Sequence, residues 1–164
     1  PQPGRVCKTQ TARISTLHFD GGVSMAVSLG EIKKMCREKG GAFRAASLFG
    51  ISKNDSGKYD FTVATASAAY AVKVLTLGEG AARVYFYRDR GYFTVYGAAD
   101  ETDYMWVAPN FPESEGGKPC TPVLLLDGEV SALEIGRGSA TTVTPGARVF
   151  GCRVYTPAAF EKLL

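Results

Sequence analysis

The chain has 164 residues, of which 45% are apolar and 21% charged, with a formal net charge of +3. This balance is typical of a folded globular protein and excludes intrinsic disorder. The length suits one domain, so we expect residues 1–164 to form a single domain. No apolar run approaches the ~20 residues that a membrane-spanning helix requires, so no membrane partner is expected.

The N-terminal part of the chain combines one predicted strand with the most clearly marked helix. Polar and apolar residues alternate over residues 13–19, which predicts a strand. Over residues 27–39 the apolar residues recur at helical spacing, and cations gather at the C-terminal end, where the helix dipole favours positive charge. Gly40 and Gly41 are expected to end this helix.

Residues 42–107 carry apolar residues with a period of two, which predicts a series of strands. Because the connections between them are short, we expect an antiparallel meander. Residues 110–121 are rich in Pro, Gly and Glu and predict the longest loop; residues 123–126 predict a buried strand that ends in a sharp turn at Asp127-Gly128. The strands of the meander are expected at residues 43–49, 59–65, 70–77, 83–88, 92–96 and 104–107.

The C-terminal residues predict a short helix. Thr156 is a good N-cap and Pro157 suits the first helical position. Phe160, Leu163 and Leu164 then fall on one side. A helix of about two turns needs a packing partner, which is either a second polypeptide or the domain's own core. The predicted fold class is therefore α+β, mainly an antiparallel twisted β-sheet meander with one N-terminal helix and a short C-terminal helix.

Residues 83–96 read RVYFYRDRGYFTVY and combine six aromatic residues with three arginines. Alternation places their side chains on two faces of a β-hairpin, and Asp89-Arg90-Gly91 supplies its turn. One interpretation is a platform on which RNA bases stack while arginines meet phosphates. The other is that β-strands favour tyrosine and phenylalanine in any case. The residues expected to contact RNA in the first interpretation are Tyr85, Tyr87, Arg88, Arg90 and Tyr92.

Few residues suggest catalysis. His18 is the only histidine, which excludes a two-histidine ribonuclease mechanism. The carboxylates at residues 100–103 and 113–115 are expected to be solvated loop residues, and Asp127-Gly128-Glu129 is expected to form a turn. No phosphate-binding or dinucleotide motif occurs and no residues have the spacing of a metal site, so neither a cofactor nor a metal is expected.

The cysteines bear on the cellular compartment. Four of them are widely spaced and allow two long-range disulfides with three connectivities. Asn54 begins an N-glycosylation sequon, Asn-Asp-Ser. Both features favour secretion, and reduced cysteines in a cytoplasmic protein are the alternative. The chain begins at Pro1 without an apolar leader, so we expect a processed chain or a fragment. The disulfide candidates are Cys7, Cys36, Cys120 and Cys152.

The order of these elements resembles the N-terminal half of the cereal-type ribosome-inactivating proteins. Residues 30–43 (GEIKKMCREKGGAF) resemble that family's first helix, and residues 59–88 resemble its β-meander, with Tyr87-Arg88 on its aromatic–arginine pair. Residues 128–138 (GEVSALEIGRG) resemble its Gly-x-Tyr-x-x-Leu region, and the helix after Thr156 resembles the one that follows. The similarity extends over nearly the whole chain.

The resemblance implies removal of an adenine from ribosomal RNA, with the base held between two tyrosines. Arg83 and Val130 occupy the positions of those tyrosines, which leaves Tyr85 as the residue to contact a base. The family's Glu-Ala-Ala-Arg helix would lie beyond Leu164, so no catalytic residue is identified in this chain. The positions that the resemblance assigns to substrate binding are Arg83, Val84, Tyr85, Gly128 and Val130.

Three functions follow as hypotheses. The first is a segment of an rRNA adenine N-glycosidase of the plant-defence toxin type, which contributes the substrate-side sheet and needs catalytic helices from a second polypeptide. By itself such a chain is expected to be inactive. The alternative is a non-catalytic, secreted, disulfide-containing binding or defence module. A third hypothesis is an RNA-binding sheet built on the tyrosines of residues 83–96.

Overall fold

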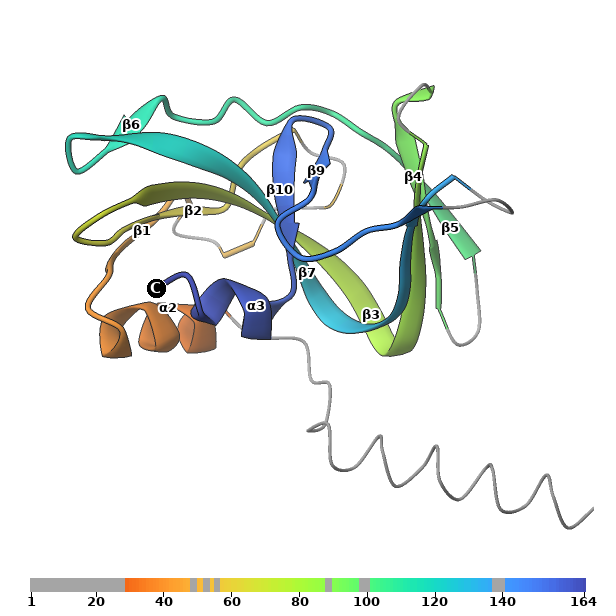
Figure 1. Cartoon of the computed structure of the whole chain (residues 1–164), viewed down its shortest axis with the longest axis horizontal. Helices are drawn as coiled ribbons and strands as arrows, with labels where there is room; N and C mark the ends of the chain where they lie inside the picture. Colours follow the sequence, from red (N-terminus) through yellow and green to blue (C-terminus); the bar gives the residue numbers. More distant parts are fainter. Residues whose placement is uncertain are drawn as a thin grey trace, which may run out of the picture.

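The computed structural model describes residues 29–47, 50–51, 54, 57–87, 90–97, 101–136 and 141–164. Two long strands, β3 (Ala69–Tyr87) and β7 (Lys118–Ile135), run parallel and side by side through the whole sheet (Figure 1). The remaining elements are α2 (Leu29–Glu38), β1 (Ala42–Ala45), β2 (Phe61–Ala64), β4 (Tyr92–Tyr96), β5 (Glu101–Met105), β6 (Ser114–Glu115), β8 (Thr141–Thr142), β9 (Arg148–Val149), β10 (Cys152–Tyr155) and α3 (Pro157–Glu161).

The sheet is mixed. Strands β1 to β5 follow one another in antiparallel pairs, which confirms the predicted meander. On the opposite edge of β3, however, β7 pairs in parallel, and β10 pairs in parallel with β7. The α+β class with one N-terminal and one short C-terminal helix is confirmed. The central β3–β7 ladder is thus parallel, and the sequence had predicted no partner for the strand at residues 123–126.

The long strands bend instead of ending at their glycines. The predicted strands at residues 70–77 and 83–88 are one strand, and the predicted turn at Asp127-Gly128 is wrong because β7 continues through it. Thr76 pairs with Asp127 and Ala81 with Glu129, so the ladder resumes beyond a register shift. Gly128 has a φ of 149°, and a Cβ added there would lie 2.9 Å from the Leu77 Cβ. Glycine therefore permits the bend without breaking the strand.

The bend divides the sheet into two halves. In the helix-covered half, the first parts of β3 and β7 carry β2 and β10 at their sides and α2 and α3 on one face (Figure 1). In the open half, the second parts pair with β4 and β8, and β5 extends the sheet beyond β4. The core under the helices consists of Ile32, Cys36, Phe61, Val63, Val72, Val74, Val123, Leu125 and Phe160.

A second core lies on the other side of the sheet. It joins the helix-free face of the first half to the inner face of the open half. Trp106 and Phe150 stack at its margin, with ring centroids 5.1 Å apart. Its buried members are Leu75, Leu77, Ala82, Val84, Phe86, Phe93, Val95, Leu124, Leu126, Val143, Val149, Cys152 and Val154.

The C-terminal helix packs on this chain's own core. Thr156 Oγ1 accepts a hydrogen bond from the Ala159 backbone N–H at 3.4 Å, as expected of an N-cap. Phe160 is fully buried and meets the Tyr70 ring edge to face at a centroid distance of 5.8 Å. Leu163 and Leu164 are half-buried against the same core. Neither described helix is long and apolar enough to cross a membrane.

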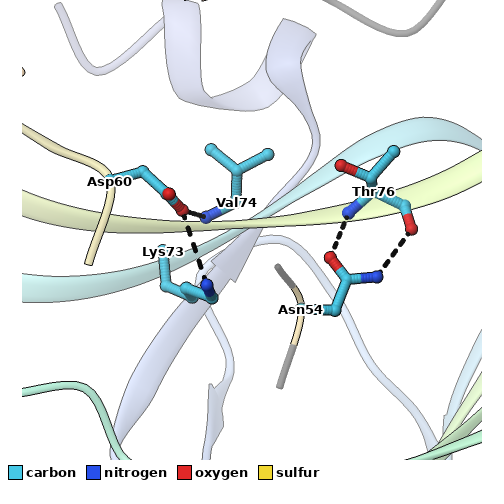
Figure 2. A network of polar contacts seen from close by, with 5 residues as sticks. All are labelled: Asn54, Asp60, Lys73, Val74 and Thr76. Carbon is cyan, nitrogen blue, oxygen red and sulfur yellow. Dashed lines mark hydrogen bonds and ion pairs between the residues drawn. The ribbon is translucent and has the colours of Figure 1, made fainter. Parts of the chain in front are cut away.

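Where β3 continues beyond its pairing with β2, side chains hydrogen-bond to its edge backbone groups in place of a neighbouring strand (Figure 2). Asp60 Oδ2 accepts a hydrogen bond from the Val74 backbone N–H at 2.7 Å. The Asn54 amide then accepts from the Thr76 N–H at 2.9 Å and donates to the Thr76 carbonyl at 3.0 Å. The Asn54 nitrogen, to which an N-glycan would be attached, thus donates a hydrogen bond to the Thr76 carbonyl in the folded chain.

A buried ion pair accompanies this edge. Lys73 Nζ lies 3.8 Å from Asp60 Oδ2, and both side chains are almost fully buried (Figure 2). Burial of a lysine requires such a partner, since an isolated charge loses its hydration at large cost. The pair therefore ties the segment before β2 to the middle of β3.

The three described cysteines are free thiols, so the predicted disulfides do not form among them. Cys36 lies in the core under the helices and Cys152 in the core on the opposite face, so the sheet separates them. Burial raises the pKa of Cys36 to about 11 and that of Cys152 to about 12. Cys7, His18 and the predicted strand at 13–19 lie outside the described residues.

Candidate functional site

The outer face of the open half collects the residues best suited to hold a ligand. Along β3, Ala82, Val84 and Phe86 are buried, and the alternate residues between them point to the other side. Strands β4 and β5 continue this alternation in register. We call this surface the tyrosine face, and it comprises Arg83, Tyr85, Tyr87, Tyr92, Thr94, Tyr96, Glu101, Asp103, Met105 and Glu134.

The face is ordered in rows, because directly paired residues on neighbouring strands project side by side. The central row runs from Glu134 on β7 through Tyr85 and Thr94 to Asp103. A second row contains Arg83, Tyr96 and Glu101, and a third contains Tyr87, Tyr92 and Met105. Along the strands the rows are about 7 Å apart.

The tyrosines form two ring pairs of different geometry. Tyr87 and Tyr92 are stacked, with centroids 4.6 Å apart and an interplanar angle of 20°. Tyr85 and Tyr96 meet edge to face at 5.4 Å and 88°. All four rings are half-buried, and Met105 beside them is 65% exposed. Solvent therefore reaches an aromatic surface that rigid strands hold in place.

Hydrogen bonds fix two carboxylates on this face. The Tyr96 hydroxyl donates to Glu101 Oε1 at 2.9 Å, and the Thr94 hydroxyl donates to Asp103 Oδ1 at 2.6 Å. Each bond uses one oxygen of a group that has two, so each carboxylate keeps a further acceptor. The carboxylate of Glu134, beside Tyr85, makes no hydrogen bond or ion pair with the residues that the structure describes.

The charge of the tyrosine face is negative, although the whole chain carries +3. Its three carboxylates, Glu101, Asp103 and Glu134, outnumber its single cation, Arg83. Arg90 lies exposed in the adjoining turn, and Arg88 is outside the described residues. The two carboxylates expected in a solvated loop, Glu101 and Asp103, belong to β5. The loop placement is wrong because β5 pairs with β4 along its whole length, whereas their exposure to solvent is as predicted.

Of the residues that the resemblance assigned to substrate binding, Val130 lies next to Arg83 in the ladder and Gly128 does not, and the set is divided between two faces. Ala82 pairs with Val130 and Arg83 with Ala132, so Val130 lies next to the start of residues 83–85, which themselves pair with residues 132–134. Arg83 and Tyr85 belong to the tyrosine face, whereas Val84 is buried in the core on the other side. Gly128 faces Leu77, and Val130 packs against the same core as Val84.

The sequence did not identify Thr94, Tyr96, Glu101, Asp103 or Glu134 as site residues. Alternation within residues 92–96 placed Tyr92, Thr94 and Tyr96 on one side, but only the register of β4 against β3 and β5 shows that this side is shared with Tyr85. The described residues contain no group of three or more His, Cys, Asp or Glu placed to hold a metal ion. No protein-family model, curated protein or solved structure matches the chain.

Proposed function

We propose that this chain is a binding module and that the tyrosine face is its ligand site. The observation that carries the proposal is the gathering of four half-buried tyrosines with hydrogen-bonding groups on one solvent-accessible face. Tyrosine suits such a role because its ring offers a flat contact area and its hydroxyl a polar contact at low entropic cost. Placement on paired strands holds these groups ready before a ligand arrives.

The composition of the face favours binding over bond cleavage. It contains stacking rings, carboxylates and one arginine, but no histidine, cysteine or lysine that would serve as nucleophile or base beside them. Two carboxylates are already engaged by neighbouring hydroxyls. This part of the proposal retains the binding-module hypothesis without its disulfides.

A binding screen with paired variants tests the proposal. The intact chain and Tyr85→Ala are compared on poly(U) RNA, a lysine-rich peptide and a panel of neutral oligosaccharides. Loss of a stacking tyrosine should weaken binding about tenfold or more, which corresponds to about 1.4 kcal/mol. Tyr59→Ala, a half-buried tyrosine outside the face, is the matched control. Equal binding by the intact chain and Tyr85→Ala would disprove the assignment of the site.

A second candidate function is the substrate-side sheet of an rRNA adenine N-glycosidase. It is favoured by one observation, that Val130 on β7 pairs with Ala82 on β3, directly before residues 83–85. A second polypeptide would have to supply the catalytic carboxylate and arginine. If it docks at the C-terminal helix, it contacts Leu163 and Leu164, because Phe160 is buried in this chain's own core.

Release of adenine from intact ribosomes tests this second candidate. The chain alone should release none, and native material that contains a co-purifying second chain should release adenine. Failure of such a two-chain preparation to release adenine would eliminate the glycosidase candidate and leave the binding proposal untouched.

A further inference from the structure

We infer that the tyrosine face takes a neutral saccharide chain. The inference rests on the proposed binding function and names the class of ligand. A saccharide presents two kinds of surface, flat patches of C–H groups and hydroxyls that both donate and accept hydrogen bonds. The tyrosine face offers a counterpart to each.

The flat patches match the aromatic rows. Tyr87 and Tyr92 are stacked on each other, and Met105 follows them in the same row. This row carries no charge, so the apolar face of a sugar ring loses little by resting on it. Because the three rows extend over about 14 Å along the strands, the face suits an oligosaccharide better than a single sugar.

The hydroxyls match the mixed polar groups of the other two rows. Glu134 and the remaining oxygens of Glu101 and Asp103 accept hydrogen bonds, while Arg83 only donates them. A ligand that meets both kinds of group must donate and accept within a short distance, as sugar hydroxyls do. Hydrogen bonds to charged groups are also the stronger ones.

The same charges oppose a nucleic acid. RNA affinity derives mainly from cations that neutralise phosphates, and here the face carries three carboxylates and a single arginine, Arg83. Arg90 lies exposed in the adjoining turn, whereas the exposed cations of Lys33, Lys34 and Arg37 lie on α2, in the other half of the molecule (Figure 1). Bases can stack on the tyrosines, but their phosphates would approach carboxylates.

A cationic peptide meets the opposite difficulty. Its positive side chains would suit Glu134 and Asp103, but exposed Arg83 stands in the adjoining row beside Tyr85 and repels them. A neutral ligand avoids both repulsions. The interspersed charges therefore favour the saccharide over either charged polymer.

Neutralisation of one carboxylate separates the three ligand classes. In Glu134→Gln the side chain keeps its shape and loses its charge, and Glu113→Gln, an exposed carboxylate outside the face, is the matched control. We expect Glu134→Gln to weaken binding of the neutral oligosaccharide about three- to tenfold, as loss of a charge-assisted hydrogen bond does. Binding should change little between 50 and 300 mM salt, because a neutral ligand displaces no condensed counterions.

Other outcomes identify other ligands. Poly(U) bound through Tyr85, with affinity raised by Glu134→Gln and falling steeply with salt, would overturn the inference in favour of RNA. A lysine-rich peptide bound with affinity lowered by both the variant and salt would overturn it in favour of a cationic partner. Either result would leave the binding function standing. Binding that Tyr85→Ala does not affect would instead refute the site itself.

Discussion

The two halves of β3 form a natural comparison, since one strand passes from a fully buried environment to a half-open one. Residues 71–75 are all buried, as expected where helices cover one face and a second core covers the other. Residues 82–87 instead alternate between buried and half-buried or exposed. A strand buried on both faces reads as a near-continuous apolar run, here interrupted by the ion-paired Lys73, and a strand buried on one face alternates. The difference shows that the helix-covered half is buried on both faces, whereas the open half leaves one face accessible to solvent.

Breaking the ion pair in the buried half should have the largest effect. Asp60→Ala leaves the Lys73 ammonium buried without this carboxylate and removes the acceptor of the Val74 N–H. We expect a loss of about 3–5 kcal/mol in unfolding free energy. Urea denaturation measures it, and the double variant Asp60→Ala/Lys73→Met should recover much of the loss. A loss below about 1 kcal/mol, typical of an exposed pair, would contradict the burial of this pair.

Two neighbouring residues test the alternation of the open half. Phe86→Ala removes a fully buried ring and should cost about 3–5 kcal/mol of unfolding free energy. Tyr85→Ala removes one ring of a half-exposed pair and should cost only about 0.5–1.5 kcal/mol. Thermal or urea unfolding of both variants gives the comparison. Equal losses would mean that the tyrosine face is as much a core as the opposite side.

The bend between the halves is tested at Gly128. Gly128→Ala introduces a Cβ 2.9 Å from the Leu77 Cβ and forces a residue with a side chain to adopt a φ of 149°. We expect a loss of about 1–3 kcal/mol, the usual cost of a strained backbone position. Gly117→Ala, which also has a positive φ but no atom within 4 Å of the added Cβ, is the control for conformational strain alone. Equal losses would show that the contact with Leu77 is unimportant.

The smallest effect concerns alkaline pH. The pKa of Cys152 is raised from 9.0 to about 12 by burial, so above pH 9 the unfolded chain releases a proton that the folded chain keeps. The stabilisation is therefore complete below pH 9 and is lost as pH rises toward 12. The urea midpoint should fall from pH 8 to pH 10, and less steeply in Cys152→Ala. Identical slopes in both proteins would show that Cys152 does not contribute.

Local sequence patterns predicted most elements but not their long-range partners. The strand at residues 92–96, the helix that ends near Gly40 and the cap at Thr156 all depend on neighbours in sequence, and each is found as predicted. The parallel ladder of β3 and β7 was missed for two reasons. Short connections favour antiparallel pairing of neighbouring strands. A local pattern also contains no information about which distant strand a segment pairs with. Asp127-Gly128 has the composition of a turn, yet the ladder on either side holds it in a strand.

The candidate site was predicted to a similar extent. Alternation was enough to place Tyr85 and Tyr87 on one side, and Tyr92 was predicted to contact RNA with them; all three share the face. Glu134 was missed because it reaches Tyr85 only through the parallel pairing of β7 with β3. A local sequence pattern can predict which residues of one hairpin share a face. It cannot predict which residues share a face because two strands distant in sequence pair with each other.

The pairing of β3 with β7 also sets an order of events in folding. Strands β1 to β5 pair with their neighbours along the chain, so the meander can form early. The hydrogen bond from Ser131 to the Ala82 carbonyl, in contrast, joins residues 49 positions apart. Contacts of such sequence separation slow folding. During synthesis, one edge of β3 therefore stays unpaired until β7 emerges, and this edge is where aggregation is most expected to begin.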